Sequence, residues 1–154
     1  MKSRSFLILV IPAFLLFVLA LWGCSNSQLQ RTLKYYGEKP GFELKIIDND
    51  SIKNGSQDGL SKLTRYLTGV KKVYILKFDS AAGNPSENQQ LYQKIQEYLK
   101  RQSFADVFSL EGRKHIGIYL KKDKSGSIEQ TLFLKWGGRY SLYIWAPSDT
   151  DQKK

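Results

Sequence analysis

Apolar, uncharged residues fill positions 6–21 and follow a short basic start that contains Lys2 and Arg4. This order, with a small residue just before the cleavage point, is typical of a secretory signal. The run is interrupted by Pro12 and is shorter than the roughly 20 apolar residues that a membrane-spanning helix requires. The pattern predicts a signal peptide over residues 1–23, and an uncut transmembrane anchor is the alternative.

The signal ends in Leu-Trp-Gly-Cys at positions 21–24. This sequence resembles a bacterial lipobox, and the resemblance implies that Cys24 becomes the lipid-carrying first residue of the mature protein. Residues 24–40 begin with polar side chains and are predicted to form a tether between lipid and domain. Leu33 and Tyr36 are more apolar than a free tether needs, so we expect the second half of the tether to dock on the domain.

Alternation between apolar and polar side chains starts at residue 42 and indicates a half-buried strand over residues 42–46. After a loop over residues 48–59, rich in Asp, Asn, Ser and Gly, an amphipathic helix is predicted to end at Gly69. Residues 73–78 are nearly all apolar, which favours a strand in the interior of a sheet.

A second helix is expected from a start signal at Asn84. A capping side chain, a Pro at the first helical position and a Glu near it follow one another there. The residues concerned are Asn84, Pro85 and Glu87, and the apolar stripe that follows them is Leu91, Ile95 and Leu99. This spacing of four residues predicts an amphipathic helix.

The last third of the chain changes to short apolar runs separated by turn residues. Four strands are predicted, over residues 104–110, 116–120, 128–136 and 140–145. Gly-Gly between the last two runs is a strong two-residue hairpin signal. The whole pattern predicts one α+β domain over residues 41–146, in the order β-α-β-α-β-β-β-β. It is a two-layer sandwich of a largely antiparallel sheet with two helices mainly on one face, followed by a polar tail at 147–154.

Both faces of this sheet are expected to be apolar, because directly paired strand residues point to the same face. The pairing rests on two-residue turns at Gly112-Arg113, Ser125-Gly126 and Gly137-Gly138. One face would hold Phe104, Phe108, Leu110, Tyr119, Leu132, Leu134, Trp136, Tyr143 and Trp145. The opposite face would hold Ala105, Val107, Ile116, Ile118, Leu120, Phe133, Leu142 and Ile144.

Helices on one face leave the other apolar face to be covered by something else. The aromatic residues Tyr119, Trp136, Tyr143 and Trp145 are predicted as a binding face for a protein partner or for self-association. Their burial in the core, with the helices divided between the two faces or with residues 33–36 folded over the sheet, is the alternative.

The net charge is +10, of which Lys2 and Arg4 contribute two, so a chain that starts at Cys24 carries +8. This charge suits an anionic membrane surface or envelope polymer, and export argues against nucleic acid. A hairpin loop concentrates part of the charge in Lys121, Lys122 and Lys124, predicted contacts to an anionic surface. Solvated loop tips are the alternative.

Candidate chemistry is sparse along this chain. Lipidation uses Cys24, the sole cysteine, which leaves no disulfide or free thiol. His115 is the sole histidine and lies near Asp106 and Ser109 without the spacing of a catalytic triad. Residues 48–51 resemble part of a calcium loop but lack the later Gly and Glu of that pattern. No catalytic residue, metal or cofactor is therefore expected.

A wider resemblance rests on hydrophobic spacing over residues 57–146. The segments that carry it are Leu60-Ser61-Lys62-Leu63, Gly69-Val70-Lys71-Lys72-Val73-Tyr74-Ile75-Leu76 and Gly117-Ile118-Tyr119-Leu120-Lys121. The pattern resembles the small bacterial lipoproteins of the domain of unknown function 4252 family. The resemblance implies an α+β envelope lipoprotein without an established activity.

These features together predict a non-enzymatic, lipid-anchored protein of the bacterial cell envelope. It is expected at the outer membrane facing the periplasm, with its sheet as a protein-binding module. One alternative is a sensor or carrier of a small apolar or anionic ligand. Another is a hydrolase of envelope polymers, which the missing acid–base pair disfavours.

Overall fold

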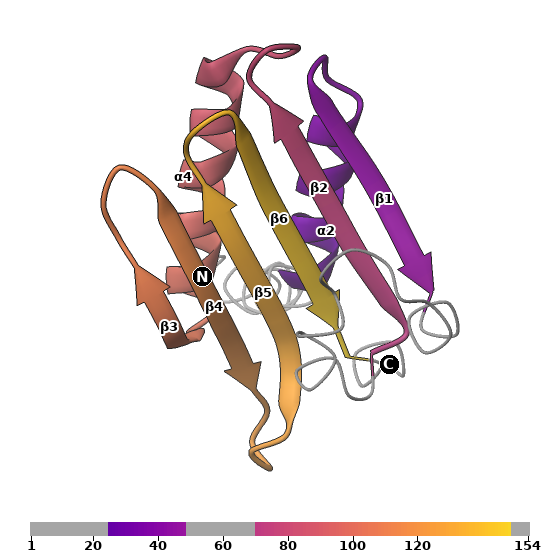
Figure 1. The fold of residues 1–154 in the computed structure, drawn as a ribbon. Coiled ribbons are helices and arrows are strands. Elements are labelled where there is room, and N and C mark those ends of the chain that lie inside the picture. Colours follow the sequence, from indigo (N-terminus) through magenta and orange to yellow (C-terminus); the bar gives the residue numbers. More distant parts are fainter. Residues whose placement is uncertain (1–24, 49–69, 149–154) are drawn as a thin grey trace, which may run out of the picture.

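The computed structural model describes residues 25–48 and 70–148. In this part of the chain it has two helices and one six-stranded sheet (Figure 1). The elements in chain order are α2 (Ser25–Gly37), β1 (Phe42–Asp48), β2 (Lys72–Asp79), α4 (Pro85–Arg101), β3 (Ala105–Leu110), β4 (His115–Lys122), β5 (Ile128–Trp136) and β6 (Tyr140–Pro147). The strand order is β1-β2-β6-β5-β4-β3, and every neighbouring pair is antiparallel.

The predicted α+β class and the order of the described elements are confirmed. Strand β2, predicted from its continuous apolar run, lies between β1 and β6 inside the sheet. The predicted helix over residues 60–69 lies outside the described residues.

The tether prediction for residues 24–40 is wrong for most of that segment, because Ser25–Gly37 form helix α2. Leu29, Leu33 and Tyr36 recur at helical spacing and are only 2%, 1% and 1% exposed. The expected docking of this segment is therefore confirmed, and the packed domain begins before residue 41.

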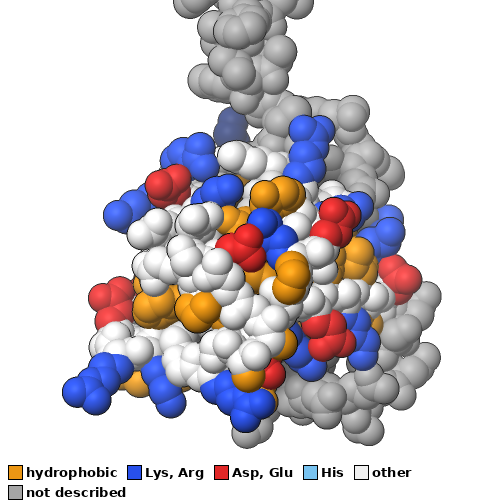
Figure 2. Space-filling model, turned by 90° about the horizontal axis from the view of Figure 1, so that it is seen from above, with side chains coloured by type: hydrophobic (Ala, Val, Ile, Leu, Met, Phe, Trp, Pro, Cys, Tyr) orange, Lys and Arg blue, Asp and Glu red, His pale blue; other side chains and the backbone are white. Residues whose placement is uncertain are grey.

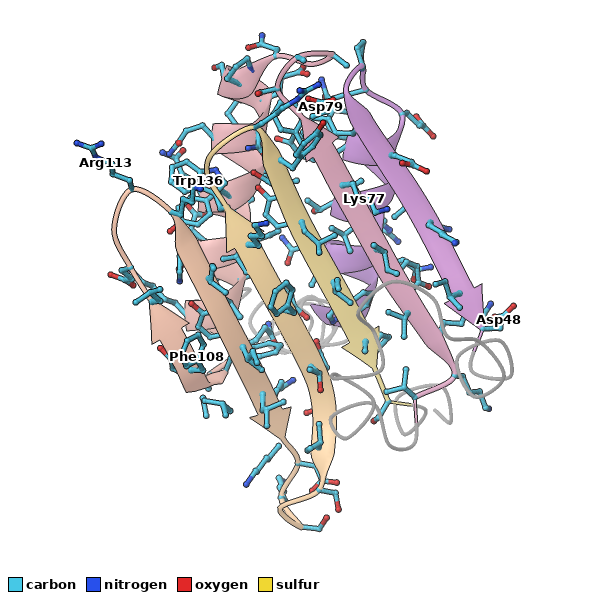
Figure 3. The ribbon with its side chains drawn as sticks, in the orientation of Figure 1. Asp48, Lys77, Asp79, Phe108, Arg113 and Trp136 are labelled. Atoms are coloured by element: carbon cyan, nitrogen blue, oxygen red, sulfur yellow. The ribbon has the colours of Figure 1, made fainter. Side chains whose placement is uncertain are left out.

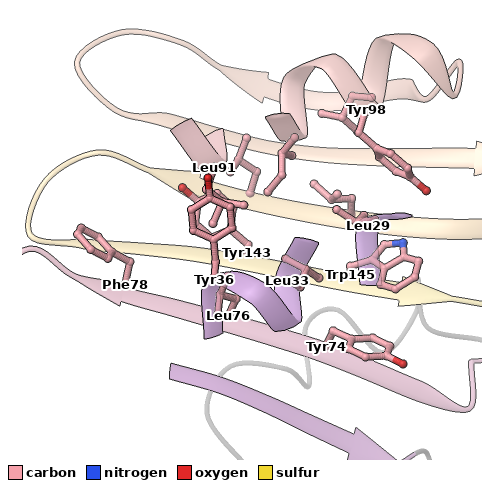
Figure 4. Close-up of a cluster of buried hydrophobic side chains, with 14 of the residues drawn as sticks. Leu29, Leu33, Tyr36, Tyr74, Leu76, Phe78, Leu91, Tyr98, Tyr143 and Trp145 are labelled. Atoms are coloured by element: carbon pink, nitrogen blue, oxygen red, sulfur yellow. The ribbon is translucent and has the colours of Figure 1, made fainter. Parts of the chain in front are cut away.

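Both helices lie on the same face of the sheet, behind it in the view of Figure 1. Their apolar residues pack with one side of the strands into the main core (Figure 4). The buried members of this core are Leu29, Leu33, Tyr36, Phe42, Tyr74, Leu76, Phe78, Leu91, Ile95, Tyr98, Leu99, Tyr119, Leu132, Leu134, Tyr143 and Trp145. We call the opposite side of the sheet the open face, because neither α2 nor α4 packs on it.

Helix α4 begins where the sequence predicts it. The side chain of Asn84 accepts a hydrogen bond from the backbone N–H of Ser86 at 2.9 Å, and Pro85 is the first helical residue. Glu87 forms an ion pair with Lys39 in the connection between α2 and β1. This contact joins the start of α4 to the end of α2.

Two of the three predicted hairpin registers differ in the structure. The register around Ser125-Gly126 is confirmed, because Tyr119 pairs with Leu132. Around Gly137-Gly138 it is shifted by two residues, so that Leu134 pairs with Tyr143 and the faces of β6 stay as predicted. Both glycines have positive φ, as a wider loop between β5 and β6 requires here.

The register between β3 and β4 is shifted by one residue over residues 108–110, which reverses the faces of these residues. Leu110 pairs with Ile116, and Phe108 pairs with Ile118, because the connector over residues 111–114 is longer than a two-residue turn. Phe108 and Leu110 therefore lie on the open face and not beside Tyr119. A bulge between Asp106 and Phe108 ends this shift, so that Ala105 pairs with Leu120 and Asp106 with Tyr119 in the predicted register.

Candidate functional site

The four aromatic residues predicted as a binding face lie in or against the core beneath the helices. Tyr119, Tyr143 and Trp145 are 8%, 1% and 2% exposed, and the half-buried Trp136 packs against the same core. The prediction of a free aromatic surface is therefore wrong. The aromatic residues are in the core with Leu33 and Tyr36, as one alternative predicts, but the helices are not divided between the two faces. The physical reason is that α2 and α4 both pack on this face.

Polar atoms of the buried aromatics are paired with two core amides. Gln130 Oε1 accepts hydrogen bonds from the Tyr98 hydroxyl at 2.9 Å and from Trp145 Nε1 at 3.0 Å. Asn88 Oδ1 accepts from the Tyr143 hydroxyl at 2.7 Å, while Asn88 Nδ2 donates to Ser141 Oγ at 3.0 Å. Buried polar groups cost free energy unless they are paired in this way, so these contacts explain how the core tolerates them.

A second polar cluster surrounds His115, which is 3% exposed. Its Nδ1 lies 2.7 Å from the Tyr92 hydroxyl, and its Nε2 lies 2.7 Å from the Tyr119 hydroxyl and 3.3 Å from Ser109 Oγ. The Tyr119 ring lies over Gly117, where an added Cβ would approach ring atoms to 2.5 Å. A glycine at this position therefore lets Tyr119 reach the histidine.

This cluster joins a histidine to a serine but does not have the arrangement of a triad. In a triad the second imidazole nitrogen is oriented by a third group, usually a carboxylate. Here, within the described residues, the Tyr92 hydroxyl occupies Nδ1, and Nε2 is shared between Tyr119 and Ser109. Burial raises the pKa of the Tyr92 and Tyr119 hydroxyls, which keeps both protonated near neutral pH. The geometry is that of a packed hydrogen-bond network.

The open face carries an apolar row that crosses five strands. Its members are paired in register from β3 to β2 and are Phe108, Ile118, Phe133, Ile144 and Ile75. We call this the transverse row. Ile144 and Ile75 are buried in a second, smaller core, whereas Phe108 at the other end is 52% exposed and its neighbour Leu110 is 58% exposed.

Basic side chains lie beside the transverse row. Lys135 and Lys77 flank Leu142 on the neighbouring register line, and both lysines are exposed. Figure 3 shows Lys77 on β2 and Phe108 at the far side of the sheet on β3. End-on, Figure 2 shows Lys and Arg side chains along the lower margin, the side to which the open face turns. Glu43 on β1 pairs with Lys77 on the same face, so the exposed part of this face is apolar with an excess of lysines over carboxylates.

The three lysines predicted to contact an anionic surface have different surroundings in the structure. Lys121 is bonded to Glu129 Oε1 at 3.3 Å and to Gln102 Oε1 at 3.4 Å, so part of its charge is compensated. Lys122 and Lys124 are exposed at the β4–β5 hairpin. This hairpin lies toward the same end of the sheet as the start of α2 (Figure 1).

Two general features bear on the site. Within residues 25–48 and 70–148, no helix is long and apolar enough to cross a membrane. In the same described ranges, no three His, Cys, Asp or Glu residues come together as a metal-binding group.

Comparison with known proteins found no matching family model, no matching curated protein and no matching solved structure. The resemblance to the domain of unknown function 4252 family therefore stays a prediction.

Most of the transverse row was predicted, because Ile118, Phe133 and Ile144 lie on the second apolar face as expected. Phe108 and Leu110 were predicted on the other face, because their position depends on the β3–β4 register. Residues 111–114, Glu-Gly-Arg-Lys, include three charged side chains, which is more typical of a longer loop than of a two-residue turn. That signal would have placed Phe108 and Leu110 on the correct face.

The Tyr143 hydroxyl provides a test of the buried network. Burial raises its pKa far above the usual value near 10, so its contribution to stability is full below about pH 10 and is lost as the pH rises further. Tyr143→Phe should cost about 1–3 kcal/mol near neutral pH, because Asn88 Oδ1 loses its donor. In urea unfolding above about pH 10, the difference between wild type and variant should shrink by about 1.4 kcal/mol per pH unit. A difference that stays constant with pH would contradict the buried hydroxyl.

Proposed function

We propose that this chain is a lipid-anchored protein of the bacterial envelope that binds a protein partner through the exposed part of the open face. The observation that carries the proposal is the transverse row, in which Phe108 is exposed and Ile118 and Phe133 are partly exposed, although two helices cover the other side of the sheet. Exposed apolar patches bordered by polar residues commonly mark interaction sites.

The chemistry of the surface defines the partner. Lys77 and Lys135 lie next to the apolar row, so the complementary surface combines apolar side chains with Asp or Glu. A protein surface supplies both in a fixed arrangement. The mature charge of +8 adds long-range attraction to such an acidic partner.

The position of the proposed lipid anchor places the membrane at one end of the sheet, and this leaves the open face to a protein partner. Cys24 is bonded directly to Ser25, the first residue of α2, so the lipid would attach at that end of the helix. Lys122 and Lys124 lie toward the same end of the sheet and suit anionic headgroups, at about 1 kcal/mol per charge. The open face points sideways from this axis and stays available to other proteins.

A non-enzymatic role is supported by the state of the sole histidine. Both ring nitrogens of His115 contact hydroxyls of the packed cluster, and its side chain is buried. A general base needs a free nitrogen within reach of the substrate. These contacts favour a role in binding over one in catalysis.

Lipid anchoring is tested by the mass of the mature N-terminus. We expect the mature chain to begin at Cys24 and to carry acyl chains, and the protein to fractionate with membranes. Cys24→Ala should abolish both acylation and cleavage, because the sulfur is the acceptor of the first lipid. Recovery of a mature protein that still begins at Met1 would contradict the anchor.

Partner binding is tested by photo-crosslinking in cells. A photo-reactive phenylalanine analogue at Phe133, in the transverse row, should give a discrete adduct with another protein. The same analogue at Tyr35, which is aromatic and 57% exposed on α2, is the matched control and should give none.

Charge reversal identifies the chemistry of that partner. Lys77→Glu combined with Lys135→Glu should strongly reduce the Phe133 adduct, because the acidic partner is repelled. Adducts to lipid alone, the same adduct at Tyr35, or an adduct that charge reversal leaves unchanged would each contradict the proposed acidic protein partner.

A further inference from the structure

Strand β3 is an edge of the sheet, and its residues 108–110 carry neither a charged side chain nor the bulge. It is the last strand in the order, and five of its six residues are exposed. An edge strand presents unpaired backbone N–H and C=O groups that can pair with another strand, and natural proteins commonly block such edges with charged residues. The opposite edge, β1, carries three charged residues, Glu43, Lys45 and Asp48, whereas β3 carries Asp106 alone and exposes Val107, Phe108 and Leu110.

We propose that β3 pairs with β3 of a second copy of this chain, antiparallel, about a two-fold axis at Ser109. The two sheets would then continue as one twelve-stranded sheet. The pairing uses the edge of the sheet and is independent of the partner proposed for the open face. An interface of this kind is isologous, since the same segment contributes on both sides.

The side chains select this register among the alternatives. With the axis at Ser109, Phe108 of each copy lies directly opposite Leu110 of the other, and both residues point to the open face. With the axis at Phe108, Leu110 would lie opposite the acidic Asp106. The register at Ser109 is the one that places apolar against apolar.

Charge complementarity favours the same register. Asp106 of one copy lies opposite Gly112 of the other, beside Arg113 and Lys114. Arg113 projects away from the loop between β3 and β4 (Figure 3), so it is free to meet a carboxylate. Two such contacts form by symmetry, one on each side of the axis. These contacts offset the repulsion between two chains of positive net charge.

The β-bulge fits this arrangement as well. Val107 is the extra residue of the bulge, and in the proposed register it lies opposite Glu111, at the margin of the paired segment. Residues 108–110 at the centre are regular on the β4 side. Dimerisation would join the exposed ends of the two transverse rows and bury Phe108 and Leu110, which are the most exposed apolar residues of the open face on β3.

A cysteine on the proposed axis provides the test. Ser109→Cys in the full-length protein in its membrane, treated with a short bifunctional thiol reagent, should give a dimer-sized adduct of two identical chains. Cys24 is the only native cysteine, so wild type measures its background. Ser86→Cys, exposed at the start of α4, is the matched control and should give no more than wild type.

Blocking the edge should remove this adduct. Leu110→Lys in the Ser109→Cys background should abolish it, and Ile46→Lys, at a 44% exposed position of the opposite edge strand, should leave it unchanged. Sedimentation velocity of detergent-solubilised chains without the engineered cysteine is an independent test. We expect wild type and Ile46→Lys to sediment as dimers and Leu110→Lys to sediment as a monomer. A monomeric wild type, an adduct equal to that of Ser86→Cys, or an adduct that survives Leu110→Lys would overturn the proposal. None of these results would change the Phe133 adduct with an acidic partner. Failure of the proposed dimer can therefore be distinguished from failure of the proposed partner binding.

Discussion

The sheet of this protein is apolar on both faces, whereas α2 and α4 cover only one of them. This imbalance determines the rest of the structure. The covered face has to accommodate aromatic residues with polar ends, which it does by placing Gln130 and Asn88 where their amide oxygens accept from Tyr and Trp donors. The open face keeps an apolar row that is buried on β6 and β2 and exposed on β3. Binding surfaces are therefore expected on the exposed β3 side of the open face.

Local signals in the sequence were sufficient for most elements of the fold. The cap at Asn84 followed by Pro85 fixes the start of α4, and the unbroken apolar run of β2 indicates an interior strand. Helix α2 was harder to predict, because its polar composition resembles a tether and its burial depends on packing against β1 and α4. The docking residues Leu33 and Tyr36 were nevertheless recognisable.

Strand register depended on contacts that are distant in sequence. Gly137 suggested a two-residue turn, but a Cβ there would lie 2.9 Å from the carbonyl oxygen of Arg113, so the glycine serves a close approach between two loops. The sequence pattern could show that both faces of the sheet are apolar and could not show which one the helices choose. The pattern consequently predicts the aromatic residues at the surface, and it places Phe108 and Leu110 on the wrong face because the predicted two-residue turn at Gly112-Arg113 does not include the one-residue shift in β3.

The central claim is that another protein chain covers the β3 side of the open face in the native envelope. Hydrogen–deuterium exchange tests it most directly when the protein in native membranes is compared with the purified, dilute chain. We predict that amides of Ala105–Leu110 exchange more slowly in the membrane, while amides of Phe42–Asp48 on the other edge exchange equally in both states. Equal exchange of the β3 amides in the two preparations would contradict the claim.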